Sequence, residues 1–413
     1  MLDIKFIREN PKLVEEKAKQ KGYDVDVDKL LKVDEDRRKL IEEVDKLRSE
    51  RKKAADARDE KKGLQLKGEL KEKENKLEKL NDQFYELVRL VPNMPKSDVS
   101  VGRDENENQV VKKVGQKPKF SFKPKDHLEL ALALGLIDVE RAAKVSGTRF
   151  GYLKNSAVGL EFALVRLALD TLSKEGFLPV IPPVLIKKEI TEDLGYWQAG
   201  GHEDYYWVLE PKETTHGFYL VGTAEHSIVP MHKDEVLSEK SLPRRYVAFS
   251  SCFRREAGSY GKDTRGILRV HQFDKVEMVS FTRSEDDDKE HEFLLSMEEK
   301  LFKALEIPYQ VVKMCTGDLG FPVARKYDLE AWIPSENKYR EVTSTSTTTD
   351  FQARRLNIKY RDGGNGGYAH ILNGTAFAIG RTLIAIMENY QQKDGSILIP
   401  KVLQKYTGFS IIP

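Results

Sequence analysis

Cysteine is scarce in this chain. Among 413 residues there are two, Cys252 and Cys315, and they lie far apart in the sequence. They cannot build a disulfide framework, which indicates a protein of the reducing cytoplasm. Neither belongs to a Cys/His cluster with the spacing of metal ligands, and the eight histidines show no such spacing, so we expect no zinc site. We expect Cys252 to be a small buried residue on a strand rather than a nucleophile.

Long apolar runs are also missing. No stretch of about 18 apolar residues occurs, which argues against a membrane-spanning helix, and the segment Met1–Arg8 lacks the apolar core of a signal peptide. Charge of one sign is not in excess, because charged residues make up 33% of the chain but the formal net charge is only +2. Any nucleic-acid surface must therefore be local. The length predicts two or three domains with a substantial core.

The N-terminal quarter has the composition of long helices. Residues 1–22 predict a short helix, with Pro11 at a helix start. From about residue 28 to residue 91 a heptad seam, apolar at its base and weaker towards its tip, predicts an antiparallel coiled coil projecting about 45 Å. We expect Gly63 and Gly68 to mark its reversal. The seam positions are Leu40, Val44, Leu47, Arg51, Ala54, Arg58 and Lys61 in the first helix and Leu70, Leu77, Leu80, Phe84, Leu87 and Val91 in the second.

Two uses of such an arm stay open from the residues alone. It is either a solvated spacer or dimerisation coil, or a surface whose basic face contacts RNA phosphates. Lys and Arg outnumber Asp and Glu only modestly across it, so the charge count does not decide between the two.

Charged and aromatic residues gather in the stretch 252–277. The runs Tyr246–Phe253 and Leu268–Met278 flank a glycine-containing loop, which predicts an antiparallel hairpin. Cations for a phosphate, an aromatic platform for a base and carboxylates for polar contacts suit a nucleotide together with an acid substrate. The alternative is a solvated strand edge with surface ion pairs. The side chains expected on the inner face are Arg254, Glu256, Arg269, Phe273 and Glu277.

The same stretch resembles motif 2 of class II aminoacyl-tRNA synthetases, specifically that of seryl-tRNA synthetases. The match consists of Phe-Arg-x-Glu-Ala-Gly-Ser, then Asp-Thr-Arg-Gly, then Arg-Val-His-Gln-Phe-x-Lys-Val-Glu. Similar strings follow the chain order of that family. They cover 145–153, a motif-1-like helix, strand and proline in 159–185, and a motif-3-like segment in 371–391. The resemblance extends over essentially the whole chain.

The resemblance implies an α+β fold. It comprises an N-terminal tRNA-binding domain, residues 1–112, with the helical arm at about 28–91, and a class II catalytic domain, residues 113–413. The catalytic domain would be built on an antiparallel β-sheet flanked by helices. A homodimer formed through motif 1 is part of the same expectation, with no membrane association.

The resemblance also assigns site residues. Arg254 and Arg381 would act in catalysis, and Glu341 with Ser344 would hold Mg²⁺ together with ATP. Thr375 stands where the family commonly has serine, which adds a methyl group to the pocket. Thr343 also stands where the family usually has serine, and it keeps the hydroxyl. The implied L-serine contacts are Thr223, Ala224, Glu225, Glu277, Asn373 and Thr375. The implied ATP contacts are Arg254, Arg255, Glu256, Arg269, Phe273, Glu341, Val342, Thr343, Ser344 and Arg381.

The implied activity is ATP-dependent activation of serine and its transfer to tRNA(Ser), with tRNA(Sec) as a further candidate. The arm and the loop around residues 260–265 would contact the tRNA. Two alternatives remain. One is a related ligase that loads an amino acid onto a carrier protein, although such relatives lack the arm. The other is a catalytically inactive RNA-binding paralogue, against which the retained charged residues argue.

Overall fold

The computed structural model describes residues 1–196, 201–209, 217–256, 265–362 and 365–413. These residues form two compact units, Met1–Met94 and Pro95–Pro413. The division falls before the expected residue 112, because Gln109–Val114 is strand β1 at the edge of the large sheet of the second unit. None of the helices in the described part of the chain combines the length and the hydrophobicity that crossing a bilayer requires.

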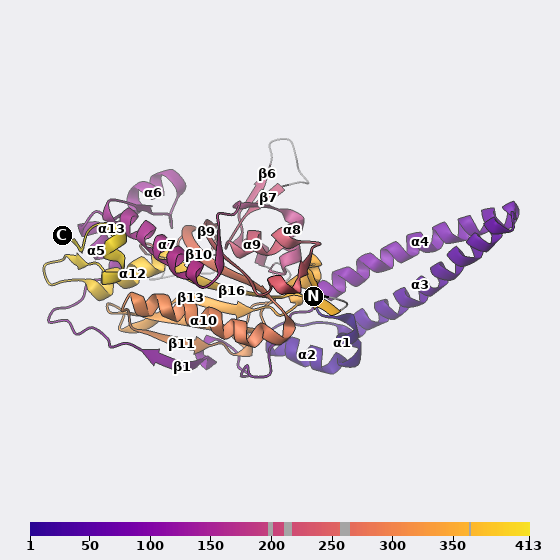
Figure 1. Ribbon diagram of the computed structural model, residues 1–413, viewed down its shortest axis with the longest axis horizontal. Helices are drawn as coiled ribbons and strands as arrows, with labels where there is room; N and C mark the ends of the chain where they lie inside the picture. The colour runs from indigo at the N-terminus through magenta and orange to yellow at the C-terminus, as the bar shows by residue number, and fades with distance from the viewer. Residues whose placement is uncertain (197–200, 210–216, 257–264, 363–364) are drawn as a thin grey trace. The chain divides into compact units, whose positions relative to one another are not determined.

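The N-terminal unit consists of four helices rather than a short helix and an arm. Pro11 occupies the first position of the second helix, where its missing N–H costs no hydrogen bond. The two long helices lie side by side as a hairpin (Figure 1). Buried residues of the predicted seam, such as Leu40, Val44, Leu70 and Phe84, join them. The helices are α1 (Ile4–Glu9), α2 (Pro11–Gln20), α3 (Val27–Asp56) and α4 (Glu60–Arg89).

The predicted position of the reversal is wrong. The chain turns at residues 57–59, where Arg58 adopts a left-handed φ of 56° and the Asp59 carboxylate caps α4 by accepting from the Lys62 backbone N–H. Gly63 and Gly68 lie inside α4. An interior glycine costs a helix about 1 kcal/mol relative to alanine, which a long packed helix tolerates, whereas the capped turn satisfies the backbone groups of the helix end.

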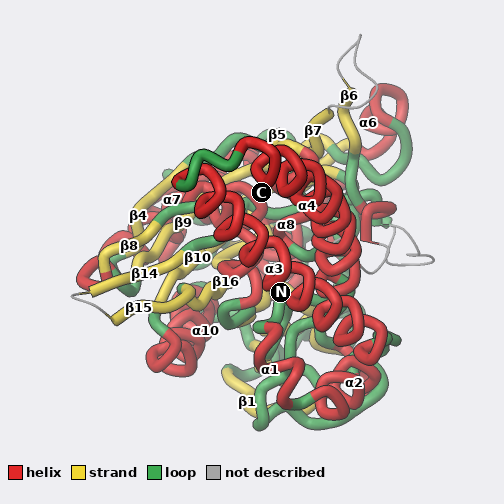
Figure 2. Tube along the Cα trace, turned by 90° about the vertical axis from the view of Figure 1, so that its right-hand side faces the viewer, coloured by secondary structure: helices red, strands yellow, loops and turns green. Residues whose placement is uncertain are grey.

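The second unit is organised around an eight-stranded sheet. Its strand order is β1-β11-β12-β13-β16-β10-β9-β4, and neighbours run antiparallel except for the parallel pair β4 and β9. Figure 2 shows β4, β9, β10 and β16 side by side. The predicted hairpin is present, although its second strand begins at Gln272 and not at Leu268. The remaining strands of the sheet are β4 (Phe177–Val180), β9 (Arg244–Phe253), β10 (Gln272–Thr282), β11 (Tyr309–Lys313), β12 (Arg325–Ile333), β13 (Lys338–Thr347) and β16 (His370–Ala378).

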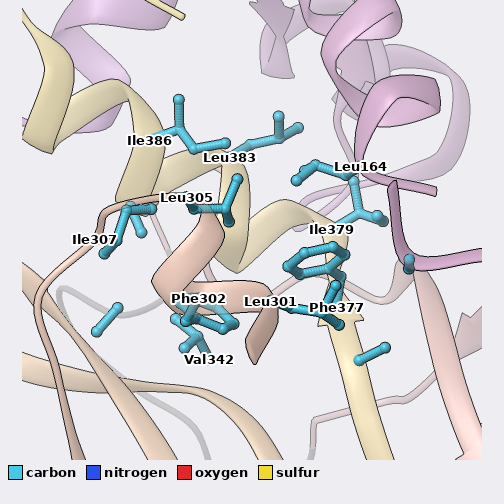
Figure 3. Close-up of a cluster of buried hydrophobic side chains, with 14 of the residues drawn as sticks. Leu164, Leu301, Phe302, Leu305, Ile307, Val342, Phe377, Ile379, Leu383 and Ile386 are labelled. Carbon is cyan, nitrogen blue, oxygen red and sulfur yellow. The ribbon is translucent and has the colours of Figure 1, made fainter. Parts of the chain in front are cut away.

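Three helices cover one face of this sheet and form the main hydrophobic core. They are α7 (Ser156–Lys174), α10 (Asp287–Ala304) and α12 (Ile379–Tyr390). The rings of Phe302 and Phe377 lie 5.9 Å apart in this core (Figure 3). Strand β10 contributes Val276 and Met278 to it and Val279 to a second cluster, because alternate residues of a strand face opposite sides. The site described below therefore lies on the face opposite these helices.

Shorter elements surround the large sheet. Strands β5 (Leu185–Lys187), β6 (Trp207–Leu209) and β7 (Gly217–Leu220) form one small sheet, and β8 (Val236–Ser238), β14 (Lys359–Asp362) and β15 (Asn365–Tyr368) form another. Two further pairs are β2 (Ile137–Asp138) with β3 (Tyr152–Leu153), and β17 (Ile397–Leu398) with β18 (Ile411–Ile412). The other α-helices are α5 (His127–Ala133), α6 (Val139–Ser146), α8 (Lys188–Leu194), α9 (Glu225–Ile228), α11 (Phe351–Leu356) and α13 (Lys401–Thr407).

Candidate active site

A pocket opens on the sheet face that points away from α7, α10 and α12. Strands β10, β13 and β16 and the first turn of α12 provide most of its walls, and the segment around Arg254 closes one end. The pocket brings together most of the residues that the sequence assigned to ATP. The charged and aromatic residues that line it are Arg254, Glu256, Arg269, Phe273, Lys275, Glu341 and Arg381.

Arg254 and Phe273 form a cationic and aromatic wall. The Arg254 guanidinium carbon lies 5.5 Å from the centroid of the Phe273 ring. Its Nε donates to the carbonyl oxygen of Gly222 at 3.0 Å, which fixes the orientation of the guanidinium. Nearby, Arg269 Nη1 lies 3.4 Å from Glu256 Oε2. An aromatic face beside fixed guanidinium groups is suited to a nucleotide, because it offers stacking for a base and donors for phosphate.

Glu341 and Arg381 form an ion pair on the opposite wall. Arg381 Nη1 donates to Glu341 Oε2 at 2.8 Å and to the Glu341 carbonyl oxygen at 3.2 Å. Burial would raise the pKa of the Glu341 carboxyl, but the positive charges of Arg381 and Lys326 outweigh burial and lower this pKa to about 2. Glu341 is therefore ionised at neutral pH. Together with the Ser344 hydroxyl, which also lines the pocket, it offers the oxygen donors that Mg²⁺ prefers.

Two bulges shape the strands that carry these residues. Leu329 pairs with Thr343 and Glu330 with Glu341, which leaves Val342 as an extra residue of β13. Because of this bulge, Glu341 and Thr343 do not share a face. A second bulge separates Thr375 from Phe377 on β16 in the same way.

A buried polar network continues below the pocket. The Lys275 ammonium lies 2.6 Å from Glu277 Oε2, and the Thr375 hydroxyl donates to the same oxygen at 3.0 Å. Lys275 and Thr375 line the pocket, and Glu277 lies beneath them. The sequence interpretation missed Lys275. The alternation of β10, which places residues 273, 275 and 277 on one face, was the signal that could have identified it.

Glu225 forms a second buried polar group. Its Oε1 accepts from the Tyr196 hydroxyl at 2.6 Å and from Gln352 Nε2 at 3.0 Å. Burial is the largest influence on this carboxyl and raises its pKa. Strand β7 ends at Leu220, and Glu225 begins the short helix α9.

Some assigned side chains do not enter the pocket. Ala224 is fully buried in the second hydrophobic cluster. Val342 and Thr343 line the pocket, but the Thr343 hydroxyl donates to Glu298 of α10 at 2.8 Å, and the Val342 side chain packs in the main core. Asn373 is buried, and its carbonyl oxygen accepts from Thr345. Arg255 lines a separate hollow with Tyr205, Tyr206, Trp207 and Tyr219.

Cys252 lies on β9 with no exposed surface, as expected for a structural cysteine. Within the described ranges, no group of three or more His, Cys, Asp and Glu side chains is arranged to hold a metal ion. Of the loop at residues 260–265 that was expected to meet tRNA, residues 260–264 lie outside the described part of the chain.

Comparison with known proteins identifies the family of this chain. The model of the seryl-tRNA synthetase N-terminal domain matches residues 1–95, and that of the tRNA synthetase class II core domain (G, H, P, S and T) matches residues 206–390. The serine–tRNA ligase of Dictyoglomus thermophilum is 48% identical over 426 residues, which cover 100% of this chain and 99% of the relative. That of Thermodesulfovibrio yellowstonii is 40% identical, with 100% of each chain covered.

Solved structures give the same result. The seryl-tRNA synthetase of Pyrococcus horikoshii complexed with ATP superposes with a TM-score of 0.91 at 42% identity, covering 100% of this chain and 99% of that one. The cytoplasmic serine–tRNA ligase of Naegleria fowleri in complex with AMP gives a TM-score of 0.89 at 32% identity, with 100% and 98% covered. With both family models matched and full-length relatives at this identity, the chain belongs to the seryl-tRNA synthetase family.

Proposed function

We propose that this chain is a serine–tRNA ligase. It uses ATP to activate L-serine as seryl-adenylate and then transfers the seryl group to the 3′ end of tRNA(Ser). The observation that carries this function is the pocket that gathers Arg254, Phe273, Glu341 and Arg381 on one sheet, in a chain that matches the family along its full length.

The nucleotide occupies the pocket between its two walls. The adenine stacks on Phe273, and Arg381 approaches from the side of β13, where it already lies against Glu341. Arg254 is oriented by Gly222 and can donate to the α-phosphate without reorganisation. Glu341 and Ser344 would hold Mg²⁺ with the phosphates, and the ion supplies charge neutralisation there when it is bound.

Serine activation then needs no nucleophile from the protein. A carboxylate oxygen of serine attacks the α-phosphorus, the bond to the bridging oxygen breaks, and pyrophosphate leaves. Negative charge accumulates on the α-phosphate oxygens in the transition state, and the Arg254 guanidinium stabilises it. The fixed positions of both substrates supply much of the remaining acceleration.

The buried polar network recognises the amino acid. Glu277, already an acceptor from Thr375, is placed to accept from the serine hydroxyl as well, and alanine cannot supply that hydrogen bond. Glu225 and Thr223 are assigned to the serine ammonium. The charge of that ammonium would favour the ionised form of Glu225 against the effect of burial.

The N-terminal arm binds the tRNA. Arg51, Lys52 and Lys53 are exposed on α3 near the tip, as are Lys61 and Lys62 at the start of α4. These cations give the tip a local positive surface for RNA phosphates even though the net charge of the chain is small.

The enzyme acts as a cytoplasmic homodimer. The outward face of α7, β4 and the segment that follows it exposes Phe162 (61%), Leu178 (56%) and Ile181 (85%), which is a large apolar surface for a monomer. Both Cys252 and Cys315 are free and buried, which fits a reducing compartment.

The test of this function is ATP–pyrophosphate exchange with a panel of amino acids, followed by charging of tRNA. Serine should stimulate exchange and the other amino acids should not. Exchange that ignores serine would contradict the assignment, and exchange without charging of any tRNA would favour the carrier-protein ligase.

A further inference from the structure

A hollow beside the small sheet β5-β7-β6 has an unusual lining. Four of its five residues are aromatic, and the fifth is a cation. On the paired strands β6 and β7, Trp207 stands opposite Tyr219, and their rings lie 4.3 Å apart at 63°. We call this feature the aromatic hollow. It consists of Tyr205, Tyr206, Trp207, Tyr219 and Arg255.

The backbone holds the Trp207 ring in place. A Cβ atom built on Gly217 would come within 2.5 Å of the indole, so the ring can lie against β7 only because residue 217 is glycine. Trp207, Tyr206 and Tyr219 are only half-buried. The rings of the aromatic hollow are therefore fixed in place, and part of their surface remains exposed for a ligand to contact.

The aromatic hollow adjoins the nucleotide pocket through a single peptide unit. Arg254 lines the pocket, whereas its neighbour Arg255 is exposed and lines the aromatic hollow. The Arg255 N–H donates to the carbonyl oxygen of Asp204 at 2.8 Å, which ties this segment to the chain that leads into β6. The aromatic hollow and the nucleotide pocket are thus lined by consecutive residues of one segment.

We propose that the aromatic hollow stacks an unpaired base of the tRNA 3′ end while the terminal ribose reaches the seryl-adenylate. Aromatic faces bind single-stranded bases whatever their sequence, and a guanidinium beside them attracts the connecting phosphate. The half-buried rings and the exposed Arg255 fit this ligand better than an apolar peptide, which would leave the cation unpaired. The proposal rests on the proposed function, because only a tRNA ligase brings such an end to this site.

The test compares Trp207→Leu with the matched control Trp207→Phe, which keeps a flat ring. Leucine should raise the KM for tRNA between about fivefold and one-hundredfold, the range for loss of one stacked base. The phenylalanine variant should change the logarithm of the KM for tRNA by less than half as much as the leucine variant does. Serine-dependent pyrophosphate exchange should stay within about twofold of wild type in both variants, because neither touches the nucleotide pocket. Equal losses of exchange and charging in Trp207→Leu would show a structural role and overturn the proposal.

A spectroscopic measurement separates stacking from mere proximity. Two tRNAs are prepared, one with 2-aminopurine as the terminal base and one with a fluorescent cytidine analogue at the penultimate position. Binding of the wild-type protein should quench at least one probe, and Trp207→Leu should lose that quenching while the arm still binds the tRNA. If neither probe is quenched by the wild type, the aromatic hollow does not stack the 3′ end. If the wild type lacks serine-dependent exchange, the proposed function fails first, and the proposal that rests on it fails with it.

Discussion

Arg381 and Glu341 neutralise each other across the wall of the nucleotide pocket, with Nη1 and Oε2 2.8 Å apart. Both side chains were assigned to ATP and its metal ion, so the two groups meant for the nucleotide are also partners of each other. ATP binding must separate or share this pair.

Glu341→Gln should lower serine-dependent pyrophosphate exchange by about one hundredfold or more, an effect typical of losing a transition-state electrostatic contact. The amide cannot neutralise Arg381, and it is a weaker ligand for Mg²⁺. The Mg²⁺ concentration for half-maximal activity should rise as well. The matched control is Glu330→Gln, which lies opposite Glu341 on β12 but outside the pocket lining and should keep its activity. Equal activity of the two variants would contradict the role given to Glu341.

Arg254→Ala should abolish most exchange, because among the described residues the Gly222 carbonyl orients no side chain but that of Arg254. The expected loss is about 3 kcal/mol or more of transition-state stabilisation, which is a factor of more than one hundred. Arg244→Ala removes an equal charge at the start of strand β9, at the other end from Arg254, which directly follows the strand, and serves as control. Exchange near the wild-type rate in Arg254→Ala would refute the assignment.

Sequence reasoning located the site because its residues lie on a few regular strands. Strand periodicity placed Phe273 and Glu277 on one face of a hairpin, and the structure keeps that arrangement. The same alternation, applied one residue further, separates Arg255 from Arg254. The resemblance assigned Arg255 to ATP, whereas its side chain lines the aromatic hollow.

Other features depend on tertiary packing and could not be read locally. Tyr196 and Gln352 reach Glu225 from segments far away in the chain, and no local pattern links them. The bulge at Val342 changes which neighbours of Glu341 face the pocket, and a one-residue insertion in register leaves no signature in composition. The predicted turn at the glycines of α4 was wrong for the opposite reason. It gave glycine, as a helix breaker, more weight than the heptad pattern of the residues around it.

Glu277→Ala should raise the KM for serine by at least tenfold and leave the KM for ATP nearly unchanged. The substitution removes the acceptor of the serine hydroxyl and also leaves the Lys275 ammonium without its partner. Thr375→Ser is the matched variant, since it keeps the hydroxyl that donates to Glu277 and removes only a methyl group. It should retain serine binding. An unchanged serine KM in Glu277→Ala would exclude this carboxylate from recognition.

Replacing residues 36–84 by a short linker should separate the two steps of the reaction. These residues include most of α3 and α4, and the catalytic unit Pro95–Pro413 has its own core. We expect nearly wild-type pyrophosphate exchange and no detectable charging of tRNA. Residues 27–35 and 85–94 are kept, because helices α1 and α2 need the base of the coiled coil to pack against. A folded deletion protein that no longer activates serine would contradict the separation of the two units.

Acidification should destabilise the catalytic unit through His226. Its Nδ1 accepts from the Gly222 N–H at 3.3 Å, which only the unprotonated nitrogen can do. Burial, aided by the cations of Arg254 and Lys275, lowers the pKa of this histidine to about 3. The unfolded chain takes up a proton below about pH 6.5, while the folded one stays neutral, so stability falls as pH drops from about 6.5 towards 3. Between pH 7 and pH 5 this residue alone should cost up to about 2 kcal/mol. His226→Gln keeps a hydrogen-bond acceptor without the titration, so its Tm should fall less over that interval in calorimetry. A fall in Tm as large as that of the wild type would show that other groups govern the acid sensitivity.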